Sequence, residues 1–221
     1  MAEGEPHEVK DHSVENFLNQ VEETANFLGE YVKLYQVHSA TFESGILSDS
    51  QTHGALRKCR AERGWALGLS VSGPNQNLVL REAMKLVEND GPLFDSVQCT
   101  FNVLEQRPKD QLQAAHDAGM DIIIKEGLAN GRALKHGTIL KYAQQLGCEP
   151  DQLALGCILA QPFQPRVLSG AVTADQLASN FKALEVGQRL KDDPDLLSEI
   201  MNACIMSSDE YWNDRSALAW N

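Results

Sequence analysis

The sequence predicts an α/β fold in which helices surround about five parallel strands, arranged as an incomplete (β/α) barrel. Apolar residues at helical spacing alternate along the chain with short β-branched and aromatic runs, as expected of a parallel sheet covered by helices. An open doubly wound sheet would show the same alternation, but no Gly-x-Gly-x-x-Gly turn follows the first strand. Polar or small residues also end nearly every predicted strand, which favours the functional rim of a TIM-barrel fold.

Helices are predicted from capping residues and from apolar residues three and four positions apart. Residues 1–12 are polar and aperiodic, and we expect this N-terminal segment to be disordered. Ser13 then caps a helix over residues 14–28 that ends at Gly29, and a single domain occupies residues 13–221. Further helices are predicted near residues 51–62, 76–88, 109–118, 133–146, 150–161, 174–187 and 194–205.

Strands are predicted from runs rich in valine, isoleucine, leucine and aromatic residues. These runs cover residues 31–40, 65–71, 93–101, 121–125 and 166–170, and a tail without a predicted helix covers residues 207–221. Side chains alternate along the first strand, so Gln36 and His38 share one face and Tyr35 points to the other. We therefore do not expect Tyr35 to act beside His38.

The composition is that of a folded protein of one domain, with 43% hydrophobic and 23% charged residues among 221. A net charge of −12 without an obvious basic patch argues against nucleic acid as a partner. No run approaches the ~20 apolar residues that a membrane span needs, so we expect a cytoplasmic protein without membrane contact. The five scattered cysteines form no Cys-x-x-Cys pair, and we expect reduced thiols.

Five ordered segments, from about residue 13 to the C-terminus, resemble the aldo-keto reductases. In the order of that family's fourth to eighth barrel strands, they are LYQVHSA, GLSVSG, VQCTFNVLE, IIIKEGLANG and VLSGAVTADQLASN. Any one of these matches would be weak, but five in the correct order are specific. The resemblance implies a (β/α) barrel that is missing its first three strands.

By this resemblance the protein is an NAD(P)(H)-dependent oxidoreductase, and its hydride transfer converts a carbonyl substrate into an alcohol. The family uses an aspartate, a tyrosine, a lysine and a histidine, and only the histidine, which orients and polarises the carbonyl, has a counterpart: His38. The other three belong to strands that this chain does not contain. Loss of a positioned general acid typically lowers the rate ~10²- to 10⁴-fold, so we expect impaired catalysis by the isolated chain.

The resemblance assigns further residues to a dinucleotide, NADP or NAD. Ser70 and Gln98 would hydrogen-bond the nicotinamide carboxamide, Lys125 stands where many members stack an aromatic ring, and Leu128 lies in the loop over the pyrophosphate. The contacts implied around the eighth strand are Gly170, Thr173, Gln176 and Asn180. The basic residues that often select NADPH are not obvious there, which leaves the choice of cofactor open.

Ordinary structural roles compete with several of these assignments. Ser70 and Gln98 could be polar residues at strand ends, and Lys125 could be a solvated lysine of the rim. Thr173 could cap the following helix, with Gln176 completing a capping box, and this role is compatible with cofactor binding.

Two alternatives to an active reductase remain open. The chain could be a non-catalytic dinucleotide-binding or protein-interaction relative, or a fragment of a full-length reductase. In either case, five strands of an eight-stranded barrel leave two unpaired edges. We therefore expect self-association, or a partner chain that completes the open barrel.

Overall fold

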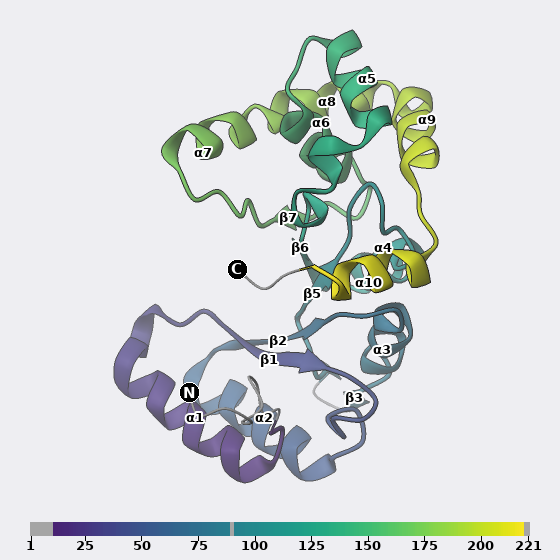
Figure 1. The fold of residues 1–221 in the computed structure, drawn as a ribbon. Coiled ribbons are helices and arrows are strands. Elements are labelled where there is room, and N and C mark those ends of the chain that lie inside the picture. The colour runs from purple at the N-terminus through teal and green to yellow at the C-terminus, as the bar shows by residue number, and fades with distance from the viewer. Residues whose placement is uncertain (1–10, 89–90, 219–221) are drawn as a thin grey trace, which may run out of the picture.

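Five parallel strands form one open sheet in the computed structural model, which describes residues 11–88 and 91–218 (Figure 1). The strands are β1 (Leu34–Ala40), β2 (Ala66–Val71), β5 (Ser96–Thr100), β6 (Asp121–Lys125) and β7 (Arg166–Val167). They are hydrogen-bonded in the order β1-β2-β5-β6-β7. Within the described residues, β1 and β7 each pair on one side only, so the predicted incomplete barrel is confirmed. Of the segment 1–12 that is predicted to be disordered, residues 1–10 lie outside the described residues. Asp11 and His12 are described and hydrogen-bond to the Ser13 amide and the His38 carbonyl oxygen.

Helices alternate with these strands. Their bounds are α1 (Val14–Leu28), α2 (Ser50–Arg63), α3 (Gln76–Ala83), α4 (Lys109–Asp117), α5 (Gly137–Leu146), α6 (Pro150–Leu159), α7 (Ala174–Phe181), α8 (Ala183–Asp192), α9 (Pro194–Cys204) and α10 (Ser208–Ser216). The predicted cap of α1 is confirmed, because the Ser13 hydroxyl accepts a hydrogen bond from the Asn16 amide and Gly29 ends the helix. None of the described helices has the length and apolar character needed to cross a bilayer.

The predicted helix over residues 76–88 is wrong in its second half. It ends at Ala83, and two short strands, β3 (Val87–Glu88) and β4 (Gly91–Pro92), follow as an antiparallel pair. Arg60 of α2 donates from its guanidinium to the carbonyl oxygen of Pro92 at 3.0 Å. A contact across 32 residues therefore helps to hold the chain in a conformation that its helical spacing did not predict.

Three other boundaries differ from the prediction. The strand predicted over residues 166–170 has only two residues, Arg166 and Val167, and the chain turns further on at Gly170, whose φ is +65°. The helix predicted over 174–187 is interrupted at Lys182, and the one predicted over 133–146 begins only at Gly137, after two 3₁₀ turns. The tail contains α10, which a hydrogen bond from the Glu210 amide to the Ser207 hydroxyl caps.

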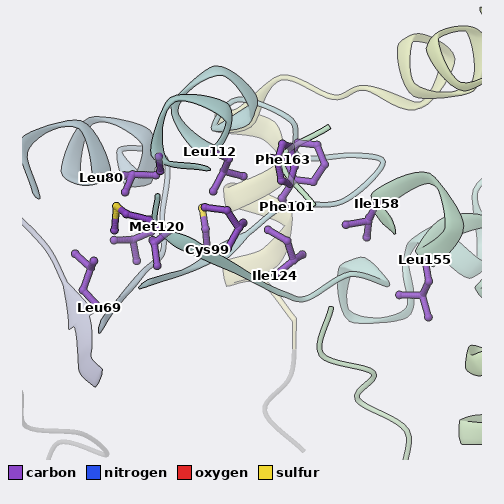
Figure 2. Close-up of a cluster of buried hydrophobic side chains, with 14 of the residues drawn as sticks. Leu69, Leu80, Cys99, Phe101, Leu112, Met120, Ile124, Leu155, Ile158 and Phe163 are labelled. Atoms are coloured by element: carbon purple, nitrogen blue, oxygen red, sulfur yellow. The ribbon is translucent and has the colours of Figure 1, made fainter. Parts of the chain in front are cut away.

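The core lies between the sheet and the helices that cover one of its faces (Figure 2). Figure 2 shows Leu69, Cys99 and Ile124 of three adjacent strands on the same side as Leu80 of α3 and Leu112 of α4. All five side chains are buried, and each buried leucine or isoleucine stabilises the fold by ~1.5 to 3 kcal/mol relative to exposure.

The opposite face of the sheet is largely polar. Gln36, Gly68 and Ser96 pair in register across β1, β2 and β5, and therefore point to the same side. A Cβ atom on Gly68 would collide with the Ser96 hydroxyl and meet Gln36 Cγ at 3.0 Å. This face corresponds to the interior of a closed barrel, and Gly68 allows the polar side chains on both sides to approach its backbone.

Candidate functional site

Four of the predicted cofactor residues line one cavity of about 970 Å³. These residues are Leu128, in the loop after β6, Gly170, in the loop after β7, and Gln176 and Asn180 on α7. The start of α6 forms another wall. Residues of two of the matched sequence segments, IIIKEGLANG and VLSGAVTADQLASN, thus meet around one cavity.

Asn180 and Ser169 hold the loop after β7 in place. Asn180 Nδ2 donates to Ser169 Oγ at 2.8 Å and to the Ser169 carbonyl oxygen at 3.3 Å. The Ala171 amide donates to the same hydroxyl at 3.2 Å. Asn180 therefore shapes the cavity as well as lining it.

Thr173 caps α7, because its hydroxyl accepts a hydrogen bond from the Gln176 amide at 3.2 Å. The Gln176 side chain differs from the predicted capping box: its Oε1 accepts from the Val172 amide at 2.9 Å, one residue before the cap. Gly170 has a left-handed backbone that favours glycine. With α7 at the outer edge of the molecule (Figure 1), these bonds fix its start beside the cavity.

The loop that carries Leu128 is strained, since Glu126, Ala129 and Asn130 all have positive φ angles. Such residues cost ~1 to 3 kcal/mol each and persist where surrounding contacts hold them. Asn102 donates from Nδ2 to the Glu126 carbonyl oxygen at 3.0 Å. The other contacts that hold this loop come from side chains of α10.

Tyr211 of α10 is fully buried against this loop. Its hydroxyl donates to Glu126 Oε2 at 3.2 Å and accepts from Asn102 Nδ2 at 3.0 Å, while Arg215 Nε donates to Glu126 Oε1 at 3.1 Å. Burial first, and then the Glu126 carboxylate, raise the pKa of Tyr211 to about 12. No local sequence pattern predicts this network, because the hydrogen-bond partners of the Tyr211 hydroxyl lie 85 and 109 residues away along the chain.

Ser70 and Gln98 are paired in register on β2 and β5, and both lie on the polar face of the sheet. Ser70 is buried, and its hydroxyl accepts a hydrogen bond from the Ser39 amide at 2.9 Å. Lys125, at the end of β6, donates from Nζ to Ser72 Oγ at 2.6 Å, just after β2 and across the intervening strand β5. Lys125 is therefore held at the rim by Ser72, which is not one of the predicted site residues.

His38 lies apart from the cavity around Asn180. It lines a separate cavity of about 170 Å³ with His12 and Gln36, and the two cavities share no lining residue. The His38 carbonyl oxygen accepts a hydrogen bond from His12 Nε2 at 2.7 Å. Tyr35 lines the same cavity as His38, and its ring stacks on that of Trp65 with the ring centroids 5.8 Å apart.

No protein-family profile and no curated protein sequence matches this chain. Solved structures of aldo-keto reductases have the same fold. For AKR11C1 from Bacillus halodurans in its holo form, the TM-score is 0.64 at 21% identity, over 83% of this chain and 68% of that enzyme. For the thermostable aldo-keto reductase Tm1743 with the inhibitor epalrestat, the TM-score is 0.62 at 22% identity, over 80% of this chain and 66% of that enzyme.

These matches establish the fold as that of an aldo-keto reductase barrel, in an incomplete form. The chain spans about two thirds of the length of the solved enzymes. The resemblance predicted from five ordered strand segments is therefore confirmed at the level of the fold.

Proposed function

We propose that this chain binds a nicotinamide dinucleotide and belongs functionally with the NAD(P)(H)-dependent aldo-keto reductases. The observation that carries this proposal is the cavity of about 970 Å³, where Leu128, Gly170, Gln176 and Asn180 come together. The resemblance to the aldo-keto reductases assigns all four to the cofactor. The family's fold, with these residues around one cavity, supports the same assignment.

The chemistry of the lining fits a dinucleotide. The first-turn amides of α7, which Thr173 caps, suit an anionic pyrophosphate, since helix N-termini carry a partial positive charge. Within the part of the chain that the structure describes, Gln176 Nε2 and Asn180 Oδ1 make no hydrogen bond to protein. These two atoms would be a donor and an acceptor for the adenosine half of the cofactor.

A bound reduced dinucleotide would supply the hydride that converts a carbonyl into an alcohol. By the family resemblance, His38 would orient and polarise that carbonyl, and Gln98 and Ser70 would bind the carboxamide. The Ser70 hydroxyl already accepts from the Ser39 amide, so its own proton would remain as the donor to the cofactor. Lys125 would place a positive charge at the same rim.

A second candidate is a dinucleotide-binding protein without catalysis. It is favoured by the separation of His38 from the cavity that four of the eight predicted cofactor residues line. Both candidates require cofactor binding, and only the first requires turnover.

Calorimetric titration with NADH and with NADPH tests the shared part, and consumption of the reduced cofactor with a simple aldehyde tests turnover. We expect binding with slow turnover, and His38→Ala should lower that turnover further without changing cofactor affinity. Binding without turnover would favour the second candidate. Absence of binding to either cofactor would overturn both.

We also propose that this chain self-associates or binds a partner chain through the open edges of its sheet. Ser96 Oγ and Thr100 Oγ1, which belong to the polar face, are buried and have no hydrogen-bond partner among the described residues. Tyr31, just before β1, and Leu168, just after β7, expose large apolar side chains beside the two open edges. Light scattering tests this proposal, and a stable monodisperse monomer of the purified chain would contradict it.

A further inference from the structure

The cavity around Asn180 is lined by acidic but not by basic side chains. Glu149, Asp151 and Asp175 contribute carboxylates to its wall. Among the described residues that line it, none is a lysine, an arginine or a histidine. The whole chain also carries a net charge of −12, so no global positive potential offsets these local charges.

Two helix starts face the same cavity. Pro150 begins α6 and Ala174 begins α7, and residues of both first turns belong to the lining. The unbonded amides of these first turns provide partial positive charge for the two negative charges of a pyrophosphate. Pro150 has no amide hydrogen, and the amides of Gln152 and Gln176 already bond the cap side chains of Glu149 and Thr173. Asp151 and Asp175 lie in these same first turns and already neutralise part of that charge. Little of this positive charge is therefore left to compensate the additional phosphate of NADP(H).

We propose that this cavity selects NAD(H) over NADP(H), and that Glu149, Asp151 and Asp175 make the selection. This inference rests on the proposed function of the cavity as the dinucleotide site. The two cofactors differ only in a phosphate on the adenosine ribose, which adds between one and two negative charges at neutral pH. Carboxylates accept hydrogen bonds from a ribose hydroxyl but repel a phosphate at the same position.

The size of the preference follows from the charges. Two unit charges roughly 8 Å apart in a medium of effective dielectric constant about 20 repel enough to weaken binding by more than tenfold. Solvent in the open cavity lowers this repulsion by screening, whereas the presence of three carboxylates raises it. We therefore expect NADH to bind about tenfold more tightly than NADPH, or better.

Asp151 and Asp175 also have a structural role as acidic residues in the first turn of a helix. That role stabilises α6 and α7, but it cannot distinguish between two dinucleotides. The ratio of the two dissociation constants therefore separates selection from stabilisation.

The test is calorimetric titration of the full chain with NADH and NADPH at low ionic strength, for the wild type and for the double variant Asp151→Asn/Asp175→Asn. The double variant should bind NADPH more tightly, and the preference for NADH should fall by about threefold or more. Asp195→Asn is a matched control, because Pro194 and Asp195 begin α9 as Pro150 and Asp151 begin α6, outside the cavity lining. It should leave the ratio unchanged.

Each outcome decides one question. Equal affinity for the two cofactors, or tighter binding of NADPH, would overturn the selection and leave dinucleotide binding intact. Binding of neither would overturn the proposed function and this inference with it. An unchanged ratio in a folded double variant would remove these aspartates from the selection. If that variant does not fold, added salt should still narrow the wild-type preference, and a salt-independent ratio would contradict the charge mechanism.

Discussion

Asn180 on α7 donates from Nδ2 to Ser169 Oγ at 2.8 Å, and this bond joins the helix to the loop that leads into it. The same hydroxyl accepts from the Ala171 amide, so Ser169 links helix and loop through one atom. The wall of the cavity is therefore held by a residue that also faces the cavity.

Replacing Asn180 by alanine should weaken cofactor binding about 5- to 30-fold, the equivalent of one lost hydrogen bond and a loosened loop. Calorimetric titration with NADH measures the loss. Asn202→Ala is the matched control, since Asn202 on α9 makes a similar bond to Ser198 at 3.3 Å outside the cavity lining. Equal affinity of the wild type and Asn180→Ala would show that Asn180 is not part of the binding site.

Gly68→Ala should lower the free energy of unfolding by about 1 to 3 kcal/mol, because the added methyl group overpacks the polar face of the sheet against Ser96 and Gln36. Gly54→Ala is a control for which the opposite effect on stability is expected. Gly54 is exposed inside α2 with no atom within 4 Å of an added Cβ, and alanine there should stabilise by about 0.5 to 1 kcal/mol. Urea unfolding curves give both values, and a neutral Gly68→Ala would mean that the face relaxes without cost.

Local signals allowed much of the fold to be predicted from the sequence. Ser13 and Thr173 were recognised as caps because capping depends on residues three positions apart. The same holds for the strand DIIIK, whose β-branched run is β6 as predicted. The four cavity residues also carried motif signals, and the structure brings them together.

What the sequence did not predict depends on contacts between distant segments. Helix α10 was missed because Tyr211 is held by Asn102 and Glu126, not by an apolar stripe of its own. The position of His38 outside the lining of the cavity around Asn180 likewise depends on how distant segments pack together, which local residue patterns do not encode. The sequence also does not predict a binding role for Asp151 and Asp175, since acidic residues in a first helical turn are common without any ligand.

Glu105→Gln should become more stable than the wild type as the pH rises above the raised pKa of Glu105, and this difference should shrink as the pH falls through that pKa. Burial raises the pKa of Glu105, while its hydrogen bond from Ser208 at 2.6 Å acts in the opposite direction. A carboxyl whose folded pKa is raised destabilises the native state when it is ionised, and it recovers stability as the pH falls through the folded pKa. Unfolding midpoints across this pH range measure the effect, and a constant difference between the two proteins would contradict it.

Tyr211 should make stability fall steeply at alkaline pH. Its pKa is raised from 10.0 to about 12, so between these values the unfolded chain loses a proton that the native state keeps. The contribution of Tyr211 is therefore complete below about pH 10 and is lost as the pH rises through 12.

Tyr211→Phe removes both the titration and the two hydrogen bonds of the hydroxyl group. It should lower the free energy of unfolding at neutral pH by about 1 to 3 kcal/mol and flatten the decline above pH 10. Tyr31→Phe, at an exposed tyrosine outside this network, should change neither value. Because the loop around Leu128 depends on Glu126, the Tyr211 variant should also weaken NADH binding. Unchanged binding together with reduced stability would show that the cavity keeps its shape without the anchor from α10.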